Sequence, residues 1–186
     1  SLSMEKLPIA QKRSQTSSNI FVIENIASAS FDALNGKTPV SIPYAVHGMT
    51  YHNNYLYMTC YKNTIIKMPV SSIGKIAAEY TVTEDGNGYI PQSITYYGTV
   101  NNEDLFIVGV EKMQKNGAFF YMIGSLSNGK FVEKKRFYVN NSAGYEQPQD
   151  IFLSLQIRSF CCHKQKKLTV HSLSTICFSA PKFLMN

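Results

Sequence analysis

The sequence predicts an all-β fold, and three observations carry this prediction. Hydrophobic residues make up 44% of the 186 residues, with 12 Tyr and 11 Phe, which is enough apolar surface to build a core. Short runs rich in Val, Ile, Thr and Tyr recur along the chain, and these residue types are enriched in strands. Turn signals containing Asn and Gly separate the runs. No run reaches the roughly 18 apolar residues that a membrane-spanning helix needs, so we expect no membrane span.

The N-terminal part of the chain carries the weakest signals. Residues 1–19 are polar and are expected to form a loose lead-in. Residues 19–23 are apolar and rich in β-branched side chains, which predicts a strand. Residues 27–34 fit either a short helix or another strand, and the Asn-Gly-Lys sequence at 35–37 predicts a turn.

From residue 46 the chain changes to a regular alternation of predicted strands and turns. Four strands joined by short turns are followed by a longer polar loop, and the same order then repeats. The first set of predicted strands comprises residues 46–51, 55–60, 64–70 and 76–82. The second set comprises residues 92–97, 104–110, 118–124 and 131–139. A third set is predicted to begin at residues 147–152.

The openings of the three sets can be aligned with one another. They are Val46-His47-Gly48-Met49, Pro91-Gln92-Ser93-Ile94 and Pro148-Gln149-Asp150-Ile151. Four-stranded antiparallel units that repeat at about 40–50 residues resemble the blades of a β-propeller. The resemblance is carried by residues 43–153, and the sequence contains no signature dipeptide of a named propeller family. It implies that residues 20–153 form blade-like structure, with about two full blades and the start of a third.

A β-sandwich of about nine strands is the alternative fold. A sandwich predicts alternating strands but not aligned unit openings, so the internal repeat favours the propeller. A closed propeller ring typically takes about four to eight blades. Because this chain supplies fewer, the resemblance implies either a truncated ring or self-association of several chains to close it.

Residues 154–186 differ from the rest of the chain in composition. They hold five of the 18 Lys and Arg residues but none of the 12 acids and none of the 11 Gly. The net charge of +6 therefore lies mostly in this basic, Cys-containing tail. The body has no basic stripe interleaved with aromatic residues, so nucleic-acid binding is not expected. Because the turn signals also stop here, we hypothesise that the tail is read out of frame.

The sequence predicts no metal site and no cofactor. Cys161, Cys162 and His163 lack the gap that lets two thiolates bind one metal. His47 and His52 fall on opposite faces of a predicted strand, so they cannot share a metal. We expect His52 to be solvated, because it begins a predicted turn. Gly-rich phosphate loops followed by a helix and the Gly-x-Ser-x-Gly pattern are also absent from the sequence.

A set of polar and aromatic residues recurs at the unit openings. The resemblance implies that the first strand of each blade lines a central channel, with ligands at its mouth. The polar residues so placed are His47, Gln92 and Gln149, and the tyrosines just before them are Tyr44, Tyr89 and Tyr145. Amides and imidazoles donate and accept hydrogen bonds, and aromatic faces cover C–H surfaces, which suits a polar, uncharged ligand. The alternative is that these side chains hydrogen-bond adjacent units.

These observations favour a binding module that recognises a glycan or a peptide at the channel mouth over an enzyme. Two alternatives stay open, since propellers host many functions. One is a fragment of a glycan-cleaving enzyme, with Asp150, His47 and Glu146 as acid/base candidates, and a carboxylate pair about 5–10 Å apart would favour it. The other is a protein-interaction scaffold, which channel-mouth residues paired to each other without a cavity would favour.

Overall fold

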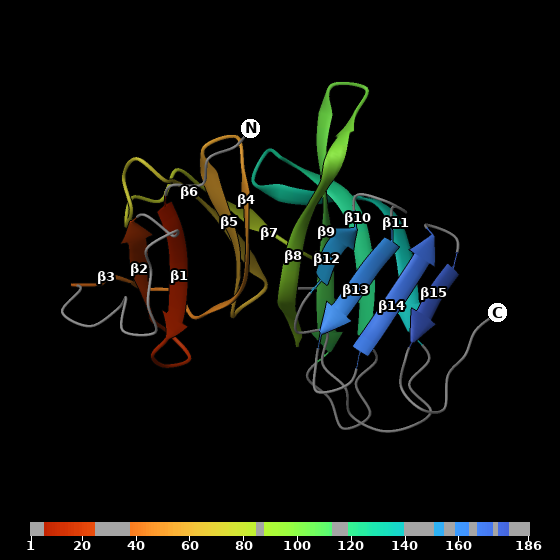
Figure 1. The fold of residues 1–186 in the computed structure, drawn as a ribbon, viewed down its shortest axis with the longest axis horizontal. Helices are drawn as coiled ribbons and strands as arrows, with labels where there is room; N and C mark the ends of the chain where they lie inside the picture. Colours follow the sequence, from red (N-terminus) through yellow and green to blue (C-terminus); the bar gives the residue numbers. More distant parts are fainter. Residues whose placement is uncertain are drawn as a thin grey trace.

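The computed structural model confirms that the chain is all-β. It describes residues 6–24, 38–84, 88–112, 119–139, 151–154, 159–163, 167–172 and 175–178. Within these ranges every regular element is a strand, and the strands form three sheets (Figure 1). No helix in the described part of the chain is long and apolar enough to cross a membrane.

The N-terminal strands form a three-stranded antiparallel sheet. Its strands, in order, are β1 (Lys6–Lys12), β2 (Ser18–Glu24) and β3 (Val40–Ile42). β1 lies in the segment that was expected to be a loose lead-in. Its seven residues all pair with β2, and residues 7–10 within it are apolar, so a strand forms inside the segment. Residues 27–34 and the turn at 35–37 lie outside the described residues.

The central sheet contains eight strands. They are β4 (Val46–His52), β5 (Tyr55–Cys60), β6 (Thr64–Pro69), β7 (Ala78–Thr81), β8 (Tyr89–Val100), β9 (Glu103–Lys112), β10 (Phe119–Ser127) and β11 (Lys130–Val139). Their order across the sheet is β4-β5-β6-β7-β11-β10-β9-β8. The sheet is mixed, because β7 and β11 run parallel where Thr81 pairs with Lys130, whereas the other neighbours are antiparallel.

These eight strands are the ones that the sequence predicted, in two runs of four consecutive strands. The runs are β4–β7 and β8–β11, and neighbouring strands within each run pair antiparallel. Asn-rich turns join several of them, because two-residue hairpin turns need residues that tolerate positive φ. The positive-φ turn residues are Asn53, Asn54, Lys62, Asn63, Asn101, Asn102, Asn128 and Gly129. The sheet order does not show that the two runs are propeller blades, and this arrangement stays a prediction.

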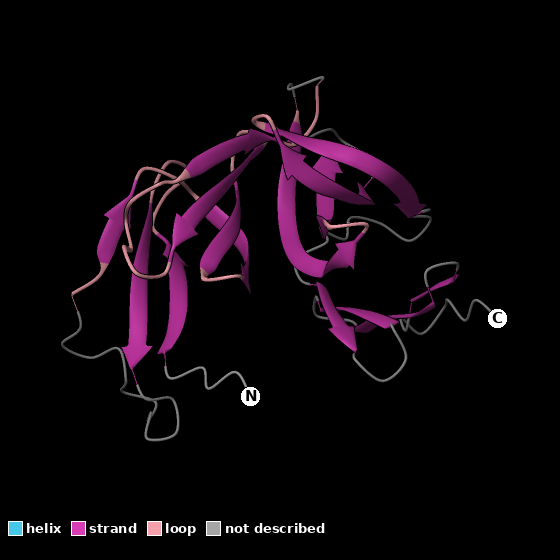
Figure 2. Ribbon diagram, turned by 90° about the horizontal axis from the view of Figure 1, so that it is seen from above, coloured by secondary structure: helices cyan, strands magenta, loops and turns pink. Residues whose placement is uncertain are grey.

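The two ends of the eight-stranded order, β4 and β8, lie close together, so the sheet curls back and nearly closes. Figure 2, a view from above, shows how strongly the strands curve. The hydroxyl of Thr50 accepts a hydrogen bond from the backbone N–H of Tyr96 at 3.3 Å. A Cβ atom added at Gly48 would lie 2.8 Å from the carbonyl oxygen of Gln92 and 2.8 Å from Cα of Ser93. Gly48 therefore permits the close approach of the two strands.

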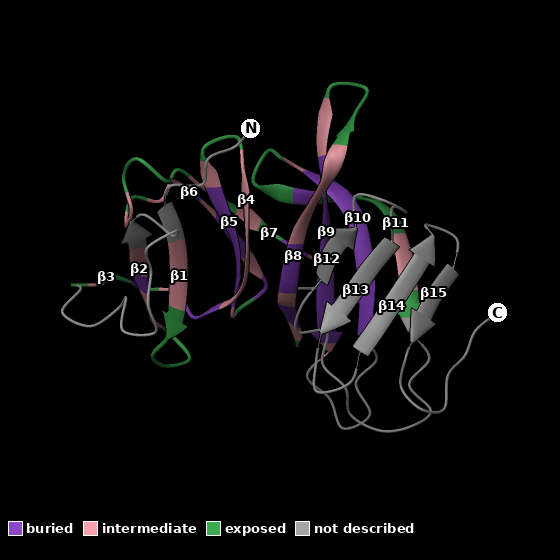
Figure 3. Ribbon diagram, in the orientation of Figure 1, coloured by how far each residue is buried: buried purple, intermediate pink, exposed green. Residues whose placement is uncertain are grey.

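Two clusters of buried side chains hold the sheets together (Figure 3). One cluster joins β5–β7 to β8–β11 and consists of Tyr57, Ile65, Val82, Ile94, Phe106, Val108, Val110, Phe120, Met122 and Phe131. The other joins the three-stranded sheet to β4–β6 and consists of Ile20, Ile42, Val46, Leu56, Met58, Cys60, Ile66 and Met68. The β4–β7 run is therefore covered by apolar contacts on both of its faces.

The C-terminal strands form a four-stranded antiparallel sheet. It comprises β12 (Ile151–Ser154), β13 (Ser159–His163), β14 (Lys167–Ser172) and β15 (Thr175–Phe178), and β12 contacts β8. Strands thus continue beyond residue 154, where the sequence pattern was expected to stop. The hypothesis about the reading frame stays a prediction.

Candidate functional site

His47 and Gln92, two of the predicted site residues, occupy matching positions in β4 and β8. The pairing of β4 with β5 shifts register across His47, and the pairing of β8 with β9 shifts register across Gln92. Each is the extra residue of a β-bulge, a feature that is common next to functional sites. The sequence alignment of the unit openings thus corresponds to the same backbone irregularity in both strands.

The imidazole of His47 bridges β1, β4 and β8. Its Nε2 lies 3.1 Å from Nζ of Lys12, and its Nδ1 lies 3.3 Å from the carbonyl oxygen of Pro91. Because an ammonium group only donates hydrogen bonds, Nε2 accepts and Nδ1–H donates to the carbonyl. Burial lowers the pKa of His47, and the charge of Lys12 lowers it further, against a smaller opposing effect of the bond to Pro91. The ring is therefore held as a neutral imidazole.

Gln92 also has a partner within the protein. Its side-chain Nε2 donates to Oε2 of Glu111 at 2.9 Å. His47 and Gln92 are thus both paired internally, as a role in holding neighbouring strands together predicts. Next to Gln92, Oγ of Ser93 is the one buried side-chain nitrogen or oxygen atom of the described residues without a hydrogen-bond partner. The predicted residues Gln149, Tyr145, Asp150 and Glu146 lie outside the described residues.

Tyr44 lines a pocket of about 390 Å³ between the β1–β2 turn and the β5–β6 turn, which we call the Tyr44 pocket. It is lined by Gln15, Thr16, Pro43, Tyr44, Ala45, Tyr61, Lys62 and Thr64. The hydroxyl of Tyr44 donates a hydrogen bond to Oε1 of Glu79. Burial, followed by this bond and the charge of Glu79, raises the pKa of Tyr44 to about 12. Tyr44 is therefore a neutral side chain in a fixed orientation.

Tyr89 lines a larger pocket of about 630 Å³, the Tyr89 pocket, between the ends of β7 and β11. It is lined by Thr81, Val82, Thr83, Glu84, Tyr89, Phe120, Lys130, Phe131, Val132, Glu133 and Arg136. The rings of Tyr89 and Phe120 meet edge to face, with centroids 5.8 Å apart. Because Phe120 is only 2% exposed, the half-buried ring of Tyr89 supplies the accessible aromatic surface of the pocket.

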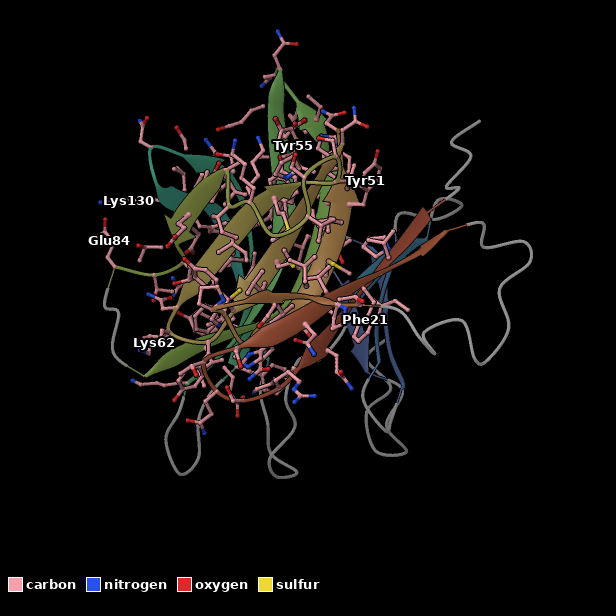
Figure 4. The ribbon with its side chains drawn as sticks, turned by 90° about the vertical axis from the view of Figure 1, so that its left-hand side faces the viewer. Phe21, Tyr51, Tyr55, Lys62, Glu84 and Lys130 are labelled. Carbon is pink, nitrogen blue, oxygen red and sulfur yellow. The ribbon has the colours of Figure 1, made fainter. Side chains whose placement is uncertain are left out.

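Two ion pairs complete the lining of the Tyr89 pocket. Arg136 donates from Nε to Glu133 Oε1 at 2.9 Å and from Nη2 to Glu133 Oε2 at 2.5 Å, and its guanidinium group lies 4.4 Å from the centre of the Phe120 ring. The second pair is exposed, with Lys130 Nζ 3.4 Å from Glu84 Oε1, and both side chains project from the same side of the molecule (Figure 4). Two acids and two bases therefore line the pocket and balance its charge.

His52 is not solvated, so that prediction was wrong. It is the last residue of β4, its side chain is 12% exposed, and its ring stacks on Tyr96 with centroids 3.6 Å apart. Its Nε2 lies 2.9 Å from Oδ2 of Asp104 in β9. The sequence located the turn beside His52 correctly, but the partners come from a hairpin about 50 residues away along the chain.

The sequence also did not single out Phe120, Glu133 and Arg136. Phe120 pairs with Tyr138 across β10 and β11, and Arg136 contacts the rings of both. Strand alternation within residues 131–139 placed Arg136 and Tyr138 on one face, which was the available signal. The parallel contact of β7 with β11, which creates the pocket, has no signal in the local pattern. Within the described part of the chain, no group of three or more His, Cys, Asp and Glu residues could hold a metal ion.

Comparisons with known proteins assign no family to this chain. No protein-family model matches it, and no curated protein matches its sequence. Among solved structures, the crystal structure of the computationally designed Ika8 protein is similar at 8% sequence identity and a TM-score of 0.33, over 90% of this chain and 56% of that one. The chain thus spans little more than half the length of this designed protein, and a likeness this weak carries no argument about fold or function.

Proposed function

We propose that this chain is a recognition module that binds a neutral glycan in the Tyr89 pocket. One observation carries the proposal: the pocket combines the half-buried aromatic ring of Tyr89 with the carboxylate and guanidinium groups of Glu133 and Arg136. Aromatic rings cover the C–H faces of a sugar ring. The carboxylate accepts and the guanidinium donates hydrogen bonds to sugar hydroxyls.

The charge balance of the pocket favours a neutral ligand. Glu84 faces Lys130, and Glu133 faces Arg136. A strongly anionic or cationic ligand would gain attraction from one member of each pair and meet repulsion from the other. A ligand with many hydroxyl groups and no net charge uses the donors and acceptors without this penalty.

Beyond Lys130, β11 pairs only with β10 among the described strands, and this open side favours a glycan over a peptide. A peptide that adds to a sheet edge gains affinity from backbone hydrogen bonds. β11 carries Glu133, Lys134, Lys135 and Arg136 in succession, and charged side chains along an edge counter the addition of another strand. A glycan has no peptide backbone that could pair with a strand, so side chains within the pocket would recognise it.

We also propose that the two runs of strands are blades of a partial β-propeller. The matching bulges at His47 and Gln92 and the close approach of β4 and β8 at Gly48 support this arrangement. In this proposal His47 and Gln92 hold adjacent blades through their internal hydrogen bonds. The tyrosines near them, rather than these two residues, contact the ligand.

Binding of a panel of neutral glycans tests the proposed function, first on an array and then by isothermal titration calorimetry. We expect Tyr89→Ala to weaken the binding of any glycan hit by about tenfold or more, which corresponds to about 1.4 kcal/mol. Tyr97→Ala, in the same strand but outside the pocket lining, is the matched control and should bind like the wild type.

Because Tyr89 also packs against the buried cluster, a second variant protects this test from misfolding. Glu133→Ala alters the pocket wall at a partly exposed position, and it should weaken binding while thermal unfolding stays close to that of the wild type. An array on which peptides bind and glycans do not would overturn the ligand class. Glycan binding that is insensitive to both pocket variants would overturn the site, and release of shortened products would indicate a cleaving enzyme instead.

A further inference from the structure

We infer that the Tyr44 pocket is a second subsite for the same ligand, which is therefore an extended glycan chain rather than a single sugar. This inference rests on the proposed function. The two pockets share a wall, and their linings have related chemistry.

The two pockets meet at one end of the β6–β7 pair. Thr64 lines the Tyr44 pocket and Thr81 lines the Tyr89 pocket. These two threonines are direct partners in the antiparallel register of β6 and β7. Paired residues of antiparallel strands have Cα atoms only about 4.5–5.5 Å apart. The walls of the two pockets are thus adjacent.

A second contact joins the two linings through the β5–β6 turn. Oδ1 of Asn63 accepts hydrogen bonds from the backbone N–H and the hydroxyl of Thr83 at 3.0 and 3.1 Å, and its Nδ2 donates to the Thr83 carbonyl at 2.7 Å. Thr83 lines one pocket, whereas both chain neighbours of Asn63 line the other. The turn is therefore a ridge with a pocket on each side.

The exposed apex of this ridge is Lys62. Its side chain points outward on the same side of the molecule as Glu84 and Lys130 of the Tyr89 pocket (Figure 4). A glycan chain that crosses the ridge over Lys62 would place successive sugar units in the two pockets.

Like the Tyr89 pocket, the Tyr44 pocket combines aromatic rings with hydrogen-bonding groups in its lining. Tyr44 and Tyr61 supply aromatic rings, and the bond to Glu79 holds Tyr44 in place. Gln15 and Thr16 add exposed polar groups from the β1–β2 turn. When one ligand occupies two such sites, the second contact is intramolecular and adds affinity that a short ligand cannot gain.

The experiment compares short and long ligands on the full chain. Cello- and malto-oligosaccharides of two and of six units are titrated calorimetrically into the wild type, Gln15→Arg and Gln11→Arg. Gln15→Arg fills the Tyr44 pocket from an exposed position without disturbing the core, and Gln11→Arg makes the same charge change at an exposed residue outside both linings. We expect the long chain to bind the wild type about tenfold more tightly than the short one, a difference of about 1.4 kcal/mol.

Gln15→Arg should abolish this advantage of length and leave the affinity of the short chain within about twofold, a change of under 0.5 kcal/mol. Gln11→Arg should retain the advantage. The inference is overturned if long and short chains bind the wild type equally, or if the advantage of length persists in Gln15→Arg. In either case, the proposed function is still supported if binding of the two-unit oligosaccharide requires Tyr89. Absence of binding by every oligosaccharide overturns both.

Discussion

His52 and Asp104 lie 2.9 Å apart, from Nε2 to Oδ2, and this contact joins the β4–β5 hairpin to the β8–β9 hairpin. The carboxylate of Asp104 also accepts a hydrogen bond from the hydroxyl of Thr99 at 2.7 Å. The imidazole stacks on the ring of Tyr96 and contacts the ring of Phe106 edge to face. The contact therefore fastens one run of four strands to the other beside the buried cluster.

Asp104→Asn is expected to lower the free energy of unfolding and to make it depend less on pH in acid. The hydrogen bonds from Thr99 and then His52 lower the pKa of Asp104. Its contribution to stability is therefore present above the unfolded pKa of about 3.9 and is lost as the pH falls through the folded value. Because the carboxylate is 36% exposed, we expect Asp104→Asn to cost only about 0.5–1 kcal/mol at neutral pH. Urea unfolding at a series of pH values below about 5 measures both effects.

Glu84→Gln is the matched control for this carboxylate. Its ion pair with Lys130 is exposed on both sides, so its loss should change the free energy of unfolding by no more than about 0.5 kcal/mol. An Asp104→Asn variant with the stability and acid slope of the wild type would show that the contact of His52 with Asp104 contributes nothing.

The strands of the central sheet could be predicted from the sequence because their signals are local. Asn53-Asn54 and Asn101-Asn102 supply the positive φ values of tight hairpin turns, and apolar runs of strand length flank them. β1 was missed because the polar residues around it outweighed the short apolar run at residues 7–10. The alignment of His47 with Gln92 could also be made from the sequence, since the bulges recur at the same place in each run.

The pockets could not be predicted in the same way, because they depend on which strands meet. The Tyr89 pocket exists where Thr81 of β7 pairs with Lys130 of β11, and these residues are separated by nearly 50 positions. Local alternation contains no information on such a pairing. The same holds for His52, whose solvated environment was inferred from its neighbouring turn and whose partner Asp104 lies in another hairpin.

The wild type is expected to lose stability in mild acid, and His47→Gln should avoid this loss. Burial and the charge of Lys12 lower the pKa of His47 below its unfolded value of about 6.5. The unfolded chain then binds a proton more readily, so the wild type loses stability as the pH falls from about 6.5 through the folded pKa. Gln stays neutral and can still donate to the Pro91 carbonyl. Urea unfolding between about pH 5 and 7.5 compares the two proteins.

Lys12→Met separates the two causes of the shifted His47 pKa. It removes the smaller cause, the nearby ammonium charge, so the pKa of His47 should rise in this variant while remaining below that of a solvated imidazole. An NMR titration of the imidazole protons reads this value directly. A wild-type His47 that titrates above its unfolded value would contradict the proposed environment.

Gly48→Ala should force β4 and β8 apart. The added Cβ would lie 2.8 Å from two backbone atoms of β8 and 3.0 Å from Oγ1 of Thr59, and backbone atoms cannot move aside as a flexible side chain can. We expect a loss of about 1–3 kcal/mol in the free energy of unfolding, the usual cost of overpacking. Ser93→Ala, at the same contact, is the control: its hydroxyl has no partner among the described residues, so deleting it should be neutral or slightly stabilising. Equal stability of Gly48→Ala and the wild type would mean that the strands are not held this closely.

Asn63→Ala is expected to be among the most damaging single changes in a turn of this protein. The side chain is 3% exposed and makes three hydrogen bonds to Thr83, and the backbone φ is +62°. Alanine loses all three bonds and adopts positive φ unfavourably, so we expect a cost of about 3 kcal/mol. Asn63→Gly relieves the backbone but not the lost bonds, and it should recover about 1 kcal/mol of that cost. Asn128→Ala, in a turn with φ +48°, tests backbone conformation at an exposed position and should cost only about 1 kcal/mol. If urea unfolding gives Asn63→Ala and Asn128→Ala the same stability, the bonds between Asn63 and Thr83 do not fasten the ridge between the two pockets.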